Sequence, residues 1–98
     1  MERLRFSILV DSDRTLNTLK PGQTARIVGV DGHDGIACRL REMGFLPGQR
    51  VTFLRSAPLG DPLKCFIQGS RVAVRVGEAR RVRVGPVDEP AISGIAEE

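Results

Sequence analysis

Glycine and proline recur so often along this chain that only short secondary-structure elements fit between them. The 98 residues include 11 glycines and 6 prolines. Between these breaks, apolar and polar residues alternate with the period of a strand that buries one face. Val72, Val74 and Val76, for example, occupy every second position of residues 71–76. Such segments predict a mainly β fold with one apolar and one largely cationic strand face.

Two Pro-Gly pairs mark the places where strands should begin. Pro21-Gly22 precedes residues 23–30, and Pro47-Gly48 precedes residues 50–55. Proline has the fixed φ, and glycine tolerates the positive φ, that the two central positions of a type II turn require. We therefore expect the same turn-then-strand device twice.

A single amphipathic helix is expected between these two strands. Ile36, Leu40 and Met43 recur at spacings of four and three, which places them on one helix face. The preceding residues, 31–35, have the composition of a loop. Gly44 follows the last apolar residue and should cap the helix with a positive φ.

The second half of the chain contains three more strand-like segments. Residues 57–62 are dense in turn formers, with Gly60 among them, and the later segments are a hairpin and a closing strand. Five short strands with one inserted α-helix and a short helical turn before the last strand indicate a small SH3-like barrel, whose closure removes exposed strand edges. The expected elements are strands 63–67 and 71–76 joined by residues 68–70, a helical turn at 77–80, and a strand at 81–84.

The charge distribution defines the expected domain organisation. The formal net charge of +3 is the sum of 0 over residues 1–18, +7 over residues 19–85 and −4 over residues 86–98. We expect an N-terminal extension at 1–15, a barrel domain at 16–85 and an acidic, disordered tail at 86–98. Within the extension, residues 6–10 are either a strand or an apolar segment that packs on the body. The basic body suggests an anionic partner, or a tail that folds back onto it.

The composition disfavours several functional classes. No apolar run approaches the length of a membrane helix, and the first residues lack a secretory signal, so a cytoplasmic location is expected. Four phenylalanines without tryptophan or tyrosine make a poor stacking platform for single-stranded nucleic acid. No phosphate-binding loop or catalytic constellation is present. We expect no enzymatic activity and no cofactor.

The metal-ligating residue types are few and scattered. His33 is the only histidine, and it lies with Asp31 and Asp34 in a loop whose composition favours solvation over a metal site. Cys38 and Cys65 lack partners at metal-ligand spacing. Both are expected to be small buried thiols without a disulfide bond. The sequence therefore predicts no native metal site within one chain.

Apolar residues at the helix end and in turns are the candidates for a binding surface. They either plug the ends of the barrel or, with nearby arginines, form an exposed patch of the kind that binds a partner. The expected partner-binding residues are Arg39, Met43, Phe45, Leu46, Leu59 and Arg75.

Several motifs resemble those of a known family. They are Leu-x-Pro-Gly at 19–22, Arg-Leu-x-x-Met-Gly-Phe-x-Pro-Gly at 39–48, Ala-Pro-Leu-Gly-Asp-Pro at 57–62, Val74-Arg75 and Glu78-Ala79. In order and spacing, over about residues 16–84, the chain resembles the FeoA family. The resemblance implies an SH3-like barrel that acts as a non-enzymatic accessory of bacterial ferrous iron uptake. It also implies docking on the cytosolic, guanine-nucleotide-binding part of FeoB, a membrane transporter, and hence peripheral association with the inner membrane.

Two alternatives remain beside this interpretation. A related domain ends the iron-dependent repressors of the DtxR type, but the chain lacks their winged-helix and metal-binding regions, which favours a free-standing protein. A basic SH3-like module could instead bind nucleic acid or anionic lipid. Salt dependence separates these classes, because phosphate contacts release counterions and weaken steeply with added salt. Binding to nucleic acid is not expected, and the oligomeric state stays open.

Overall fold

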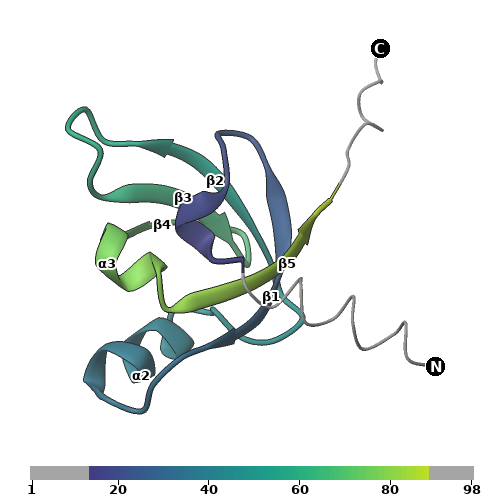
Figure 1. Ribbon diagram of the computed structural model, residues 1–98, viewed down its shortest axis with the longest axis vertical. Coiled ribbons are helices and arrows are strands. Elements are labelled where there is room, and N and C mark those ends of the chain that lie inside the picture. The colour runs from purple at the N-terminus through teal and green to yellow at the C-terminus, as the bar shows by residue number, and fades with distance from the viewer. Residues whose placement is uncertain (1–13, 89–98) are drawn as a thin grey trace.

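A computed structural model describes residues 14–88 of the chain. Its five strands form one curled antiparallel sheet in the order β4-β3-β2-β1-β5, with the helices beside it (Figure 1). The expected fold class, with one inserted helix and a short helix before the last strand, is confirmed. The elements are η1 (Leu16–Thr18), β1 (Thr24–Val30), α2 (Gly35–Glu42), β2 (Arg50–Ser56), β3 (Leu63–Ile67), β4 (Ser70–Val74), α3 (Val76–Ala79) and β5 (Val82–Val87).

The alternating strands place their apolar residues in one core. Val82 and Val84 of β5 are fully buried while Arg81 and Arg83 are only partly buried, as the alternation predicts. Phe45 is the largest of the fully buried side chains. The core is made by Leu16, Leu19, Ala25, Ile27, Leu40, Phe45, Val51, Phe53, Leu63, Cys65, Ile67, Val74, Ala79, Val82 and Val84.

The two Pro-Gly turns are hydrogen-bonded to the two central strands, β1 and β2. Gly22 and Gly48 have φ of +89° and +91°, as expected for these turns. In the first turn, the Gly22 N–H donates to the carbonyl of Phe53 at 2.7 Å, and the Phe53 N–H donates to the Gln23 carbonyl at 2.9 Å. In the second, the Gly48 N–H donates to the Ile27 carbonyl at 2.8 Å, and the Ile27 N–H donates to the Gln49 carbonyl at 2.8 Å. Each turn is therefore bonded to the strand that follows the other turn.

Helix α2 forms as its apolar stripe predicts. The Asp34 side chain caps its start by accepting from the Ala37 N–H at 3.1 Å. Leu40 is fully buried, and Ile36 and Met43 pack against the core while partly exposed. Gly44 follows with φ of +113°, which confirms the expected cap.

The hairpin between β3 and β4 forms where the sequence predicts it. Its two loop residues, Gln68 and Gly69, have φ of 50° and 79°. Positive φ at both central positions is characteristic of the type I′ turn, whose twist matches that of the flanking strands. The second strand of the hairpin, expected to end at Val76, ends at Val74, and Val76 instead begins α3.

The edges of the domain differ from the expectation in two ways. Strand β5 continues to Val87, which pairs with Ala25, so the barrel domain extends past residue 85 and the segment from 86 begins as strand. Pro86 is tolerated there because β5 is an edge strand and needs fewer N–H donors. No ladder joins β4 to β5 within residues 14–88, and α3 connects them instead. Residues 1–13 and 89–98, with the expected apolar segment 6–10 and most of the acidic tail, lie outside the described residues.

Candidate functional site

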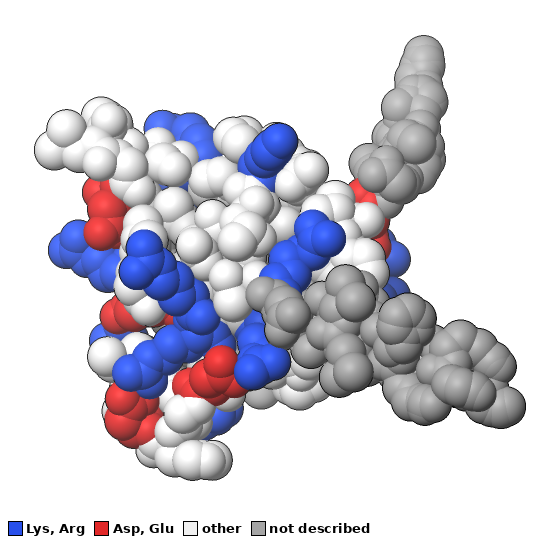
Figure 2. Space-filling model, viewed as in Figure 1, with Lys and Arg blue, Asp and Glu red and all other residues white. Residues whose placement is uncertain are grey.

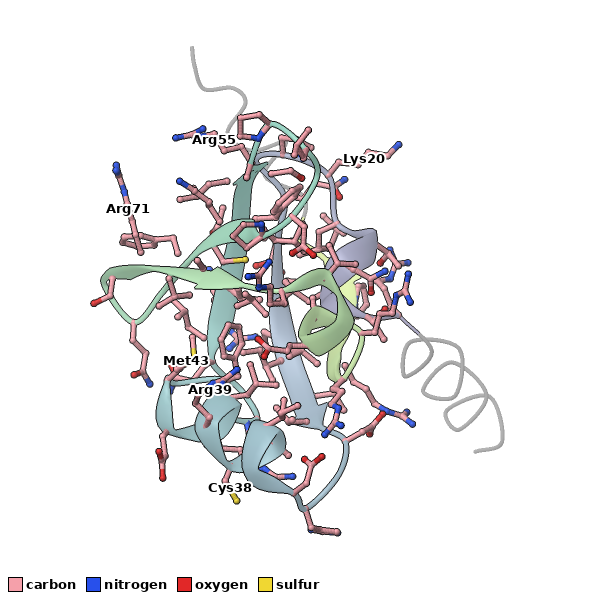
Figure 3. All side chains as sticks on the ribbon, turned by 90° about the vertical axis from the view of Figure 1, so that its left-hand side faces the viewer. Lys20, Cys38, Arg39, Met43, Arg55 and Arg71 are labelled. Carbon is pink, nitrogen blue, oxygen red and sulfur yellow. The ribbon has the colours of Figure 1, made fainter. Side chains whose placement is uncertain are left out.

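The expected partner-binding residues lie on α2, in the turn after it, in the β2–β3 loop and just before α3. Arg39 and Met43 lie one turn apart on and just after α2, and both are found in the lower half of Figure 3. Arg75 precedes α3, and Leu59 lies in the loop between β2 and β3, at the upper left of the ribbon in Figure 1. We call the surface formed by Arg39, Met43, Leu46, Leu59 and Arg75 the helix-side surface.

Two carboxylates that belong to the sequence motifs but were not expected to be site residues link the parts of this surface. Glu78 of α3 accepts from the Arg39 guanidinium and, at 3.3 Å, from the backbone N–H of Arg75. Asp61 accepts from the Val76 N–H at 3.0 Å and so ties the Leu59 loop to the start of α3. The Glu78 position carried one signal, since a glutamate near the start of a helix commonly accepts from the preceding backbone N–H.

Leu59 is the most exposed large apolar side chain on this surface, with 95% of its area accessible. Its loop is nevertheless ordered, because the Gly60 N–H donates to the Ala57 carbonyl at 2.8 Å and the Ala57 N–H to the Pro62 carbonyl at 2.9 Å. Gly60 has φ of +91°. A hydrogen-bonded turn thus holds a leucine side chain out in solvent, where a partner can contact it.

Phe45 does not belong to this surface, and its assignment as a partner-binding residue is wrong. Its side chain is fully buried. The left-handed Gly44 turns the chain back over the end of α2, and the Phe45 N–H bonds to the Leu40 carbonyl at 3.2 Å. This reversal directs the Phe45 ring into the core, where it fills one end of the barrel.

Leu46 and Leu59 lie at opposite ends of strand β2. Leu46, 40% exposed, precedes the turn that leads into the strand, and Leu59 follows the strand. Seven residues of β2 separate the two regions, a length of about 20 Å at the usual rise per residue. A partner that contacts both leucines must therefore cover most of the helix-side surface.

The acids of the 31–35 loop neutralise arginines of the last strand region. Arg81 donates to both Asp34 oxygens at 2.6 and 2.9 Å, and the Arg83 Nε donates to Asp31 at 2.9 Å. The hydrogen bond from Arg81 holds the pKa of Asp34 at about 2, below its usual value. Among residues 14–88, no three histidine, cysteine, aspartate or glutamate side chains gather as a metal would require.

The two cysteines differ in environment. Cys65 is buried as expected, and burial raises the pKa of its thiol to about 11. Cys38 is exposed, which contradicts the expectation of a buried thiol. It lies two residues before the buried Leu40, a rotation of about 200° on a helix, and so points away from the core.

Thiol labelling should distinguish the cysteines. In the native protein, a thiol reagent at neutral pH should modify Cys38 rapidly and Cys65 only at the rate of unfolding, because the thiolate is the reactive form and Cys65 is both buried and protonated. Mass spectrometry of the labelled peptides measures both rates. A Cys38→Ser variant that still reacts quickly would contradict the burial of Cys65.

The curled five-stranded sheet, with one inserted helix and a short helix before the last strand, is a small SH3-like fold. The chain belongs to the FeoA family, since the sequence model of the FeoA domain matches residues 14–86. The crystal structure of Stenotrophomonas maltophilia FeoA, described as an SH3 domain protein complexed with zinc, is 38% identical, with a TM-score of 0.64 over 71% of this chain and 87% of that chain. The solution structure of Chlorobium tepidum FeoA is 32% identical, with a TM-score of 0.67 over 72% of this chain and 68% of that chain.

A longer relative joins this domain to a second protein. An Fe(2+) transport protein A/Fe(2+) transporter FeoB fusion protein of Porphyromonas gingivalis is 35% identical over 81 residues. These residues are 83% of this chain but only 10% of the fusion protein. In the part of this chain that the structure describes, no helix has the length and hydropathy needed to cross a bilayer.

Proposed function

We propose that the chain is a non-enzymatic accessory of ferrous iron uptake that docks on the cytosolic part of a FeoB-type transporter. The observation that carries this proposal is the helix-side surface, where the hydrogen-bonded β2–β3 loop presents Leu59 at 95% exposure. The fusion of a related sequence to a FeoB transporter supports the choice of partner. In this arrangement the protein works at the cytoplasmic side of the membrane.

The chemistry of the helix-side surface suits protein docking. Apolar and arginine side chains at the centre of an interface contribute most of the binding energy, and surrounding polar groups exclude water. The pairing of Arg39 with Glu78 fixes α2 against α3, so little conformational entropy is lost when a partner binds. Charge should set the rate of encounter, and the apolar contacts should set the lifetime of the complex.

The test compares Leu59→Asp with a matched control. Leu59→Asp should weaken binding to the purified cytosolic part of the transporter from the same genome by at least about tenfold, since a buried anchor is replaced by a charge. Its thermal unfolding should match the parent because Leu59 contributes nothing to the core. Val28→Asp places the same charge at a strand position that is 46% exposed and outside this surface, and it should bind like the parent.

Calorimetry without lipid measures the affinities, and growth on ferrous iron as sole iron source measures function in the cell. A folded Leu59→Asp protein that binds and supports growth like the parent would move the interface elsewhere. Equal loss in both variants would show that added charge alone is responsible. Arg75→Glu should also weaken binding, and an effect of Arg75→Glu without one of Leu59→Asp would favour a purely anionic partner.

A further inference from the structure

The outer face of strands β2, β3 and β4 carries cations that have no acidic partner among residues 14–88. Arg55 lies directly opposite Lys64 in the β2–β3 ladder, and Lys64 lies opposite Ala73 of β4. Arg71, two residues before Ala73, lies opposite Phe66. We call this surface of Arg55, Lys64, Phe66 and Arg71 the cationic sheet face.

Over the helices, by contrast, several cations lie beside acidic side chains, as the neighbouring blue and red atoms at the lower left of Figure 2 show. Arg39, Arg50, Arg81 and Arg83 each pair with a carboxylate. Arg26 and Arg41 donate to backbone carbonyls. The other cations without a carboxylate partner elsewhere in residues 14–88 are Arg14, Lys20, Arg75 and Arg80. Like charges directly opposite each other in a sheet destabilise it, so the Arg55 and Lys64 pair should lower the stability of the domain. No acidic side chain among residues 14–88 neutralises either cation.

The cationic sheet face is hollowed and has an apolar floor. A pocket of about 440 Å³ is lined by Leu54, Arg55, Lys64, Arg71, Val72 and Ala73. Phe66, 42% exposed, adds an aromatic ring at its side. In Figure 3, Arg55 and Arg71 lie in the upper left of the view, above Arg39 and Met43. The face is therefore separate from the part of the helix-side surface that Arg39 and Met43 form on α2 and just after it.

We propose that the cationic sheet face binds the anionic headgroups of phospholipids at a membrane surface. Lysine and arginine close to an anionic bilayer attract it electrostatically, and exposed apolar groups among them enter the headgroup region. The three cations supply the electrostatic contribution, and the apolar floor with Phe66 supplies the apolar one. A nucleic acid fits less well, because three cations and one exposed ring offer few phosphate and stacking contacts.

The proposal rests on the proposed function only for the presence of a membrane nearby. Docking through the helix-side surface leaves the cationic sheet face uncovered, so the protein contacts transporter and lipid together. Two weak contacts of this kind raise the overall affinity, because the second becomes intramolecular once the first has formed.

The test is sedimentation of the full purified chain with vesicles of phosphatidylcholine alone or mixed equally with phosphatidylglycerol. The parent should bind only the anionic vesicles, and added salt should release it. Arg55→Gln with Arg71→Gln should weaken binding by about 25-fold, since each basic residue near the surface contributes about fivefold. Arg14→Gln with Arg80→Gln removes the same charge from exposed positions off this face and should change binding by no more than about twofold.

The assay contains no transporter, so its outcome is independent of docking. Absence of binding to anionic vesicles at low salt, equal binding to neutral vesicles, or equal loss in the two double variants would each overturn the proposal. Tighter binding to a DNA or RNA duplex than to vesicles would overturn it in favour of nucleic acid. The Arg55→Gln and Arg71→Gln variant should unfold at the same or a higher temperature, because it relieves a like-charge contact.

Discussion

Replacing Phe45 by alanine should lower the free energy of unfolding by about 3 to 5 kcal/mol. The side chain is the largest of the fully buried ones, so its removal loses apolar burial and leaves a cavity. Phe66→Ala makes the same chemical change at a position that is 42% exposed, and it should cost less than about 1 kcal/mol. The two variants together separate core burial from surface contact.

Urea denaturation followed by circular dichroism measures both phenylalanine variants. Because small domains have total stabilities of only about 5 kcal/mol, Phe45→Leu provides a milder change whose loss stays measurable. A surface role for Phe45 would appear as near-parental stability in Phe45→Ala together with weaker binding to the transporter. That result would contradict the placement of this ring in the core.

Gly44→Ala should cost about 2 kcal/mol from backbone strain, with only a small further loss from crowding because the exposed Gln68 side chain can shift. Gly44 has φ of +113°, and a Cβ there would lie 2.9 Å from the Gln68 Oε1. Gly48 has φ of +91°, and a Cβ added there has no atom within 4 Å. Gly48→Ala should therefore lose stability from backbone strain alone. Both variants should fold, with lower midpoints of denaturation.

A double variant resolves the two contributions at Gly44. Gln68→Ala removes the crowding side chain, so Gly44→Ala combined with Gln68→Ala should regain the part of the loss that exceeds that of Gly48→Ala. The comparison is a double-mutant cycle of unfolding free energies. Equal stability of Gly44→Ala and the parent would show that the helix ends without a left-handed residue.

Local patterns made most of the fold predictable. The Pro-Gly turns, the stripe of Ile36 and Leu40, and the alternation around Val82 each depend on residues close in sequence, and each formed as expected. Such patterns are reliable because turn geometry and side-chain periodicity are fixed within a few residues.

Features set by the position of one element against another were not predictable. Phe45 is buried because Gly44 reverses the chain, and Cys38 is exposed because α2 presents Leu40 to the core. The sequence suggested charged patches but gave no pairing of cations with acids, which is long-range: Arg81 meets Asp34 across 47 residues of sequence. The free cations of the sheet face emerge only after these pairs are assigned.

Each Pro-Gly turn is hydrogen-bonded to the strand that follows the other turn. We therefore expect the centre of this small domain to open and close as one unit. Neither turn completes its bonds until the other's strand is in place, so local opening at one releases groups at the other. The backbone amides of Gly22, Ile27, Gly48 and Phe53 should therefore exchange with solvent together, in a single cooperative opening. Arg55 and Leu59, one from each proposed binding surface, lie on β2 and in the loop directly after it, so this cooperative centre should fix their relative positions.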